Sequence, residues 1–208
     1  MVKLAGPCFS MSASGKLGGV LVFSSWKGGP LARKLVTPAN PKSALQVSVR
    51  AMLRFLSQDW VNVGSTPQGS WAPRAAAGNY SPFNGYISAN MSRWREFQPP
   101  SQTDPAPETG TLPVATLDSA TGGVHCMDVQ YSVGTANDVW GMLLFRSPTA
   151  VFDTSISNLV RVLKVSGIGT FTYTDSGLEA GDYWYDARFF TTEGVLGPEE
   201  GEVTDTVL

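Results

Sequence analysis

The stretch SGKLGGVLVFSSWKGGPLARKLVTPANPKSALQ, residues 14–46, decides the fold of the first half of the chain. Glycine pairs at 18–19 and 28–29 bracket the run 20–26, which is too short for a helix and rich in strand-forming residues. The run 31–37 alternates apolar and basic residues, as a strand with one solvated face does. The two runs together predict a β-hairpin.

A helix is expected directly after the hairpin, with Asn40 as its N-cap and Pro41 at its first position, where a missing N–H costs nothing. Apolar residues recur on one face of this helix: Leu45, Val49, Met52, Leu53, Leu56 and Trp60. Polar and basic residues step by four along the opposite side: Lys42, Gln46, Arg50 and Arg54. We therefore expect Leu53 and Leu56 in the core and a basic ridge on the outside.

Two further helices are expected to begin with a capping residue followed by proline. Thr66–Pro67 opens a short segment around Trp71 that ends at Gly78, and Ser81–Pro82 opens a longer one. Residues 1–13 show no period and are interpreted as an extended arm. Residues 1–97 are thus predicted to form a small helical domain with a β-hairpin.

Residues 98–113 contain five prolines and are predicted to be an extended, semi-rigid linker. Beyond it the hydrophobic period changes from 3.6 to 2. Seven short strands are predicted within residues 114–208, the number that is typical of a β-sandwich: 114–117, 124–133, 138–146, 158–165, 169–174, 182–192 and 202–207. The predicted fold class is α+β, in two domains.

Composition describes a globular chain with an uneven charge distribution. Of the 208 residues, 42% are hydrophobic and 15% charged. Residues 1–100 hold eleven Lys and Arg against two acids, whereas residues 101–208 hold four against fifteen acids. This asymmetry predicts two domains in different surroundings and permits head-to-tail contact between copies.

Several function classes find no support in the sequence. No apolar run reaches the length of a membrane helix, and the first residues lack the apolar core and cleavage site of a signal peptide. Cys8 and Cys126 lie in different halves, which favours reduced thiols and cytosolic synthesis. Ser14-Gly15-Lys16 lacks the glycine and hydroxyl residue that a P-loop needs, at positions where Ser10 and Leu17 stand.

No catalytic or metal-binding pattern emerges either. His125 is the only histidine, lies in a predicted strand and has no nucleophile beside it, and two distant cysteines with one histidine make no zinc site. Acids of the second half cluster at predicted turns, where solvation explains them better than glycoside hydrolysis. A calcium ion at 198–205 remains an alternative without motif support. We predict no enzyme, no cofactor, no small-molecule ligand and no metal site.

The basic first half has two interpretations. Its cations can bind nucleic acid, with Trp26, Trp60, Trp71 and Trp94 as stacking surfaces. Three of these tryptophans, however, occupy apolar helix positions, which favours a core role. We expect the cations to meet an acidic protein neighbour and expect no nucleic acid partner.

The first half resembles a group of poorly characterised tailed-phage and prophage proteins that are encoded among virion structural genes. The resemblance covers residues 13–97 and is carried by four motifs: GKLGG (15–19), WKG (26–28), TPANP (37–41) with Ser43 and Gln46, and SPFNGY (81–86) with Asn90. Pro67, Gly69 and Pro73 shorten the helix that relatives place around Trp71. The resemblance implies a virion component.

The second half resembles fibronectin type III domains at LEAGDYWYDARF (178–189), followed by Glu193-Gly194 and Gly197-Pro198. This resemblance implies a fibronectin III or immunoglobulin-like sandwich in which Tyr185, Ala187 and Phe189 point inward. The resemblance also implies that Tyr183 points inward and takes the tyrosine-corner role. Trp140 does not stand where the core tryptophan of such domains usually does.

The sequence thus predicts a structural component of a tailed-phage virion, made in the bacterial host cytoplasm, as a tail, connector or capsid-decorating protein. Its partners would be other virion proteins and copies of itself. The predicted assembly interface consists of Val20, Val22, Phe23, Trp26, Arg33, Lys34, Lys42, Arg50 and Arg54. The alternative is a carbohydrate- or cell-surface-binding module that uses Trp184 and Phe190 as an exposed aromatic platform.

Overall fold

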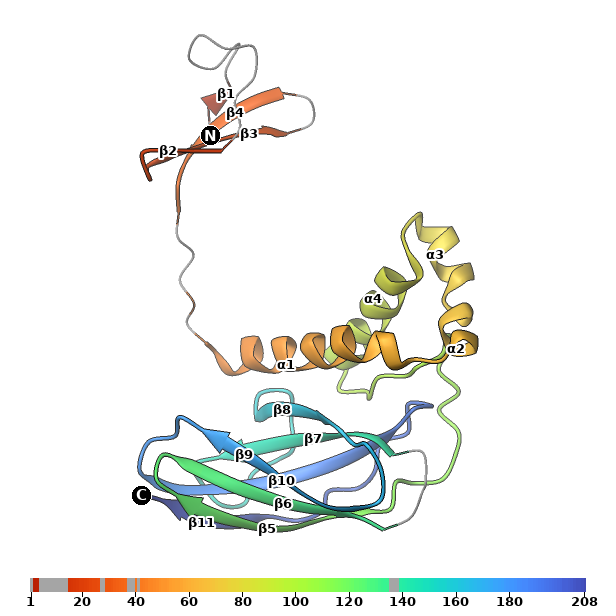
Figure 1. Ribbon diagram of the computed structural model, residues 1–208, viewed down its shortest axis with the longest axis vertical. Coiled ribbons are helices and arrows are strands. Elements are labelled where there is room, and N and C mark those ends of the chain that lie inside the picture. The colour runs from red at the N-terminus through yellow and green to blue at the C-terminus, as the bar shows by residue number, and fades with distance from the viewer. Residues whose placement is uncertain (1, 4–14, 27–28, 37–39, 41, 135–138) are drawn as a thin grey trace. The chain divides into compact units, whose positions relative to one another are not determined.

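The computed structural model describes residues 2–3, 15–26, 29–36, 40, 42–134 and 139–208 (Figure 1). The chain divides into two compact units, Met1–Pro41 and Lys42–Leu208. The division therefore falls before the first helix, whereas the sequence analysis placed it within the linker 98–113. The reason is that the helices share a core with the sandwich, as described below.

The first unit is a four-stranded antiparallel sheet in the order β1-β4-β3-β2. The predicted hairpin is present as β3 (Leu21–Trp26) and β4 (Gly29–Lys34), and β2 (Gly15–Leu17) and β1 (Val2–Lys3) flank it. Gly18 and Gly19 have φ values of 56° and 67° in the turn between β2 and β3, a backbone region that favours glycine. Of the predicted arm 1–13, residues 1 and 4–13 lie outside the described residues.

The first helix of the second unit, α1 (Ala44–Asp59), begins later than predicted. Ser43 is its N-cap, and Lys42 has a φ of 49°, which is incompatible with a right-handed helix at that position. Pro41, the predicted first helical residue, lies outside the described residues.

The buried face of α1 also differs from the prediction. Met52 and Leu56 are buried as expected, but Leu53 is exposed, with 40% of its surface accessible. Leu45 and Val49 are exposed too, at 59% and 38%. The buried face instead includes the aromatic residue Phe55 and two polar residues, Ser48 and Asp59. A pattern of apolar residues alone misplaced the face, because buried polar side chains with hydrogen-bond partners contribute to it.

Four further helical segments follow α1 in the described residues 42–134, and α4 is the longest of them. A 3₁₀ turn, Trp60–Asn62, leads into α2 (Ser65–Ser70) and α3 (Ala72–Gly78), and α4 spans Pro82–Arg95. The predicted start at Ser81–Pro82 is confirmed, since the Ser81 hydroxyl accepts the Asn84 N–H at 3.3 Å. The predicted start at Thr66–Pro67 is wrong, because α2 is capped by Gly64 and includes Thr66.

The seven predicted strands of the sandwich are all present. They are β5 (Ala115–Gly123), β6 (Cys126–Val133), β7 (Val139–Ser147), β8 (Leu159–Lys164), β9 (Gly169–Ser176), β10 (Gly181–Thr191) and β11 (Val203–Val207). They form a four-stranded sheet in the order β11-β10-β7-β8 and a three-stranded sheet in the order β5-β6-β9. All pairings are antiparallel.

The two sheets enclose a core of alternating side chains. Tyr185, Ala187 and Phe189 of β10 are buried in it, as predicted, together with Met142 of the neighbouring strand β7 and Met127 of β6 in the facing sheet. The Tyr183 hydroxyl donates to the Glu179 carbonyl oxygen at 3.2 Å, the backbone bond that a tyrosine corner makes.

The outer face of the four-stranded sheet carries a second core, which α1 and α4 cover. Trp140, Phe145 and Phe190 from the sheet pack there with Phe55 and Trp94 from the helices. Figure 1 shows α1 lying along β8, and the unit is thus three layers thick: helices, four-stranded sheet, three-stranded sheet. A sheet buried on both faces is apolar at nearly every position, and β7 is buried at all but one of its residues.

The proline-rich segment 98–113 packs between α4 and the sandwich. Asn90 exchanges two hydrogen bonds with the Ser101 backbone, at 3.0 Å and 2.8 Å, and Ser101 is fully buried. The Gln102 N–H donates to the carbonyl oxygen of Thr192, in the turn directly after β10, at 2.8 Å, while the Gln102 carbonyl accepts the indole N–H of Trp71 at 2.8 Å. This segment therefore joins the helices to the sandwich and does not act as a spacer.

Candidate assembly interface

Strand pairing in the first unit places apolar and basic residues side by side. Val22 in β3 lies opposite Lys16 in β2 and Arg33 in β4, and Leu21 lies opposite Lys34. Residues that lie opposite each other share a face of the sheet, so both faces carry a mixture of apolar and cationic side chains.

The sheet of the first unit buries few of its own side chains. Among residues 15–24, 31–36 and 40, Leu31 is the one that is buried. Leu17, Val20, Leu21 and Val36 are exposed at 56%, 59%, 37% and 70%. Hydrophobic side chains of this size usually find cover when a β-sheet folds.

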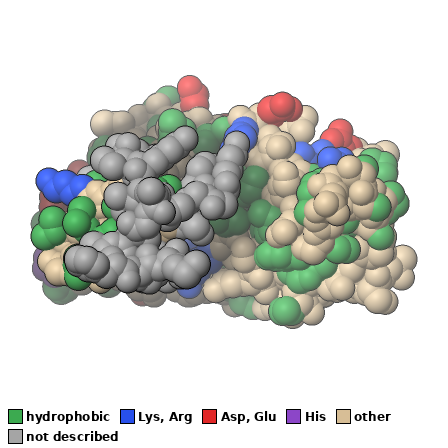
Figure 2. Space-filling model, turned by 90° about the horizontal axis from the view of Figure 1, so that it is seen from above, with side chains coloured by type: hydrophobic (Ala, Val, Ile, Leu, Met, Phe, Trp, Pro, Cys, Tyr) green, Lys and Arg blue, Asp and Glu red, His purple; other side chains and the backbone are tan. Residues whose placement is uncertain are grey.

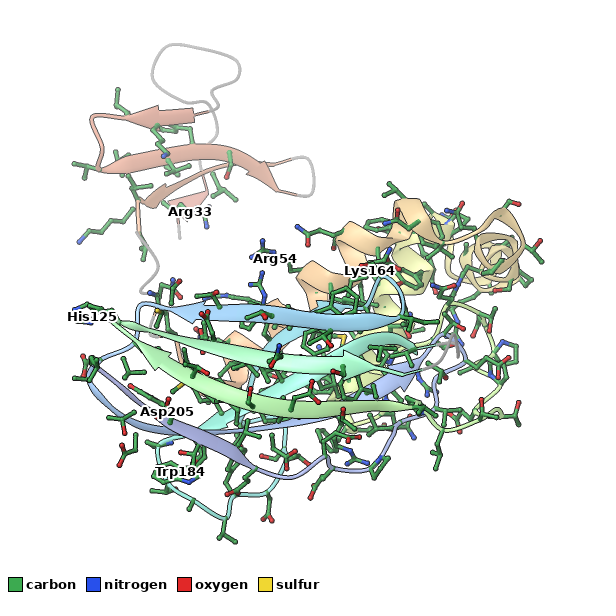
Figure 3. The ribbon with its side chains drawn as sticks, turned by 60° about the horizontal axis from the view of Figure 1, so that its bottom comes forward. Arg33, Arg54, His125, Lys164, Trp184 and Asp205 are labelled. Carbon is green, nitrogen blue, oxygen red and sulfur yellow. The ribbon has the colours of Figure 1, made fainter. Side chains whose placement is uncertain are left out.

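The structure brings six of the nine predicted interface residues into this one sheet. Val20 is exposed in the turn before β3, Val22 and Phe23 are half-buried, and Trp26 is the last residue of β3. Arg33 and Lys34 are exposed on β4, and Figure 3 labels Arg33 there.

The other three predicted residues, Lys42, Arg50 and Arg54, belong to the second unit. Lys42 precedes α1, while Arg50 and Arg54 are exposed on the helix. The predicted interface residues are therefore divided between the two units.

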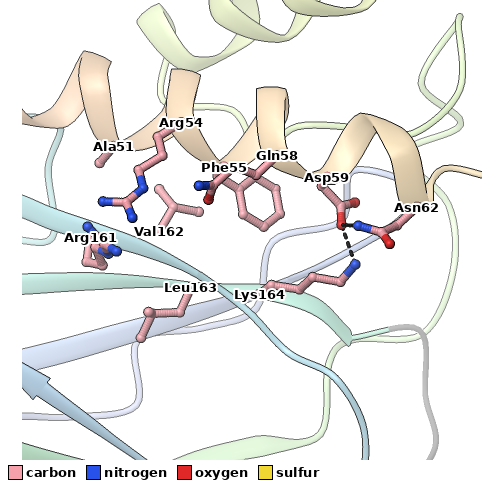
Figure 4. A pocket seen from close by; sticks show the side chains of 10 residues that line it. All are labelled: Ala51, Arg54, Phe55, Gln58, Asp59, Asn62, Arg161, Val162, Leu163 and Lys164. Carbon is pink, nitrogen blue, oxygen red and sulfur yellow. Dashed lines mark hydrogen bonds and ion pairs between the residues drawn. The ribbon is translucent and has the colours of Figure 1, made fainter.

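A groove of about 250 Å³ runs between α1 and β8 in the second unit. Figure 4 shows the residues that line it: Ala51, Arg54, Phe55, Gln58, Asp59 and Asn62 from the helical side, and Arg161, Val162, Leu163 and Lys164 from β8. Sequence analysis had identified Arg54 but neither of the two cations of β8, which lie more than 100 residues further along the chain.

Asp59 fastens the helical layer to the sheet at one end of this groove. Its carboxylate is 2% exposed, accepts the Trp140 indole N–H at 2.6 Å and forms an ion pair with Lys164. The Asn62 side chain donates to it at 3.3 Å. One signal for this role was present in the sequence, since Asp59 is one of two acids among the first hundred residues and lies next to Trp60.

Arg54 and Arg161 make no ion pair within the part of the chain that the structure describes. The Arg161 guanidinium lies over the Tyr173 ring, 5.9 Å from its centre. Burial and Asp175 raise the pKa of Tyr173, whereas Arg161, Arg146 and Arg54 act to lower it. The guanidinium groups of Arg54 and Arg161 therefore both influence the pKa of the same residue, Tyr173.

The aromatic platform proposed for carbohydrate binding is not formed. Phe190 has no exposed surface, because its ring packs 5.5 Å from that of Phe55 and 5.6 Å from that of Trp140. Trp184 is half-buried in the part of β10 that pairs with β11, opposite Thr204, and Figure 3 labels it near Asp205 and away from Arg54 and Lys164. The helical layer, which the sequence analysis placed in another domain, covers the face on which Phe190 lies.

His125 lies in the turn between β5 and β6, where its φ is 56°, and not within a strand as predicted. Its Nδ1 is 3.1 Å from the Leu178 carbonyl oxygen, and its backbone N–H donates to the Leu208 carbonyl oxygen at 3.1 Å. These contacts fasten the turn to neighbouring segments. Figure 3 shows His125 at the tip of the sandwich.

Three acids of 198–205 accept hydrogen bonds within the protein: Glu199, Glu202 and Asp205. Glu202 accepts the backbone N–H groups of Val151 and Phe152 at 3.0 Å and 2.8 Å, and Glu199 accepts the Thr154 hydroxyl. Burial raises the pKa of the Asp186 carboxyl, while the N–H of Ala187 lowers it. Glu199 and Glu202 therefore have a structural role, because they join residues 151–154 to the segment that follows β10.

Among the described residues there is no group of three or more His, Cys, Asp or Glu side chains that could hold a metal ion. In the same residues, no helix has the length and apolar character needed to cross a membrane. Ser10 and Ser14 of the rejected P-loop pattern, and Cys8, lie outside the described residues.

Comparisons with known proteins do not identify a family. No protein-family model matches the chain, and no curated protein matches it. Among solved structures, half of this chain is similar to 14% of a β-1,2-glucanase from Parabacteroides distasonis, with 16% identity and a TM-score of 0.40. In addition, 47% of this chain is similar to 35% of the FN1–FN3 domains of chicken CNTN1, with 15% identity and a TM-score of 0.32. Similarities this low carry no argument about function.

Proposed function

We propose that this protein is a structural assembly component whose first unit, the β1–β4 sheet, attaches it to a larger particle. The observation that carries the proposal is the near absence of buried side chains among the described residues of that sheet. A small sheet with apolar residues on both faces is marginal alone and gains stability when other surfaces cover them.

The magnitude of the hydrophobic effect supports attachment through this sheet. Full burial of a side chain such as Leu21, Val22 or Phe23 contributes about 1.5–3 kcal/mol. Covering several of them offsets the cost of ordering a protein at an interface. The adjacent cations Lys16, Arg33 and Lys34 would favour an acidic neighbour. Charged side chains are sparse on the face shown in Figure 2, in keeping with a charged content of 15%.

The particle that we propose is a tailed-phage virion, in which the chain serves as a tail, connector or capsid-decorating protein. Support for this context comes from the motif resemblance of residues 13–97, since the sheet alone indicates only attachment. We further propose that the sandwich is of the fibronectin III type, supported by the bond from Tyr183 to Glu179 and by the inward alternation of β10. Its partners would be other virion proteins and further copies of the chain.

Incorporation into purified particles tests this function. Phage particles assembled with the Phe23→Asp variant should contain less than a tenth of the normal amount of this protein, as measured by quantitative mass spectrometry. The reason is that a charge replaces a half-buried aromatic ring in the β1–β4 sheet. Thr172→Asp, at an exposed position of β9, is the matched control and should leave incorporation unchanged. Normal incorporation of a folded Phe23→Asp variant would refute attachment through this sheet.

A further inference from the structure

We propose that the α1–β8 groove binds an extended acidic segment of another protein chain, which joins the four-stranded sheet as a fifth strand beside β8. This proposal concerns the second unit and does not rest on the attachment of the first. Its three supports are the free edge of β8, the two arginines beside it and the chemistry of the residues that line the groove.

The first support is the edge of the sheet. β8 is the last strand in the order β11-β10-β7-β8, so one side of its backbone has no strand partner in the described part of the protein. The Val165 N–H donates to the Trp140 carbonyl oxygen in β7 at 3.0 Å. Because backbone groups alternate in an antiparallel strand, those of Leu163 also face β7, and those of Val162 and Lys164 face away from it.

The second support is the charge at that edge. Arg161 comes from β8 itself and Arg54 from α1, and Figure 4 shows their side chains extending toward the same end of the groove. No described carboxylate pairs with either one, whereas the third cation, Lys164, is paired with Asp59. Two guanidinium groups so placed favour a carboxylate between them, which each can bind through a bidentate pair.

The third support is the chemistry of the lining. Ala51, Phe55 and Val162 give the groove an apolar part beside its cations. An extended peptide directs successive side chains to opposite sides, so a segment that alternates acidic and small apolar residues would fit both parts. A nucleic acid fits less well, because its phosphates accept hydrogen bonds but provide no donors for the free carbonyl groups of β8.

The test uses the full chain and a nine-residue fluorescent peptide of alternating glutamate and valine. Anisotropy should show saturable binding, and amide NMR shifts should centre on Val162 and Lys164. Arg54→Gln and Arg161→Gln should each weaken binding about tenfold, since each removes a charge-assisted contact. Arg95→Gln, at an exposed position near the end of α4, is the matched control and should bind like the wild type.

Two modified probes separate strand addition from simple charge attraction. A peptide with lysine in place of glutamate, and one with N-methylated backbone amides on its pairing side, should both lose binding to the wild-type chain. Equal binding of the N-methylated peptide, or equal shifts of the same amides with inorganic phosphate, would overturn strand addition. Absence of binding by the acidic peptide at millimolar concentration would overturn the site itself.

The test of the groove can fail without affecting the proposal that the first unit attaches the protein to a particle. Phe23→Asp changes the first unit and should bind the acidic peptide as tightly as the wild type. Should peptide binding fail while Phe23→Asp still blocks incorporation into particles, the groove proposal falls and the attachment proposal stands.

Discussion

At the scale of single residues, Asp59 shows how one buried carboxylate can join two layers. We expect Asp59→Ala to lower the free energy of unfolding by about 1–3 kcal/mol, because the buried Trp140 N–H loses its acceptor. The ion pair with Lys164 adds less, since the Lys164 side chain is 43% exposed. Urea denaturation followed by Trp fluorescence measures the change, and an unaltered midpoint would contradict this role.

Tyr86 is a second residue with a measurable consequence. Its hydroxyl is buried with no hydrogen-bond partner among the described residues, and burial, with a smaller effect from Asp59, raises its pKa far above 10.0. The folded state therefore keeps a proton that the unfolded state releases above about pH 10. The wild-type chain therefore loses no stability through Tyr86 ionisation below about pH 10, and it loses stability as the pH rises above that value.

Tyr86→Phe should accordingly unfold at a higher urea concentration than the wild type at pH 7, because its free energy of unfolding is about 1 kcal/mol larger. Its advantage should grow between pH 10 and 11.5, because the variant has no proton to lose at this position. Tyr80→Phe, at an exposed position, is the control. A wild-type chain that loses no more stability than Tyr86→Phe over this pH range would show that Tyr86 does not resist ionisation.

At the scale of elements, the orientation of α1 is the most direct test of the helical layer. Phe55→Ala should cost about 3–5 kcal/mol, because its ring fills space between Trp140 and Phe190. Leu53→Ala should cost less than about 1 kcal/mol, because Leu53 is 40% exposed. Thermal unfolding of both variants compares them, and equal losses would restore the face that the sequence analysis proposed.

The segment 98–113 yields another prediction at this scale. Limited proteolysis of the native chain should leave 98–103 intact, because its backbone is hydrogen-bonded to Asn90, Trp71 and Thr192. Peptide mapping by mass spectrometry locates the cuts. Early cleavage within 98–103, giving separate helical and sandwich fragments, would restore the linker interpretation.

Strands were easier to predict than layers, for physical reasons. Gly, Pro, Asn or Asp residues separate the sandwich strands from one another, so the sequence located all seven. The packing of the helices against the sandwich could not be predicted, because the five prolines of residues 98–113 indicate a spacer between two domains. One signal opposed that interpretation: VWGMLLF, residues 139–145, is apolar throughout, as in a strand buried on both faces.

The candidate sites could be predicted less completely than the fold. Val22, Phe23 and Arg33 followed from local alternation in the hairpin, and the structure places them in one sheet. The α1–β8 groove depends on contacts between residues more than 100 positions apart, such as Arg54 and Arg161. Local periodicity contains no information about such contacts.

At the scale of the whole molecule, the central claim is a division of roles. Residues 42–208 form a three-layer unit with two cores of its own, while the first unit leaves apolar residues exposed. The three-layer unit should therefore fold without the first unit, and the first unit should be required for attachment.

The most direct test is a competition in which host cells make equal amounts of the full chain and of residues 42–208 during particle assembly. Quantitative mass spectrometry of purified particles gives the ratio of the two forms. The account predicts that the full chain is enriched at least tenfold, although the fragment is folded and has the same thermal midpoint. Equal incorporation of the two forms would contradict the claim and would assign attachment to the three-layer unit.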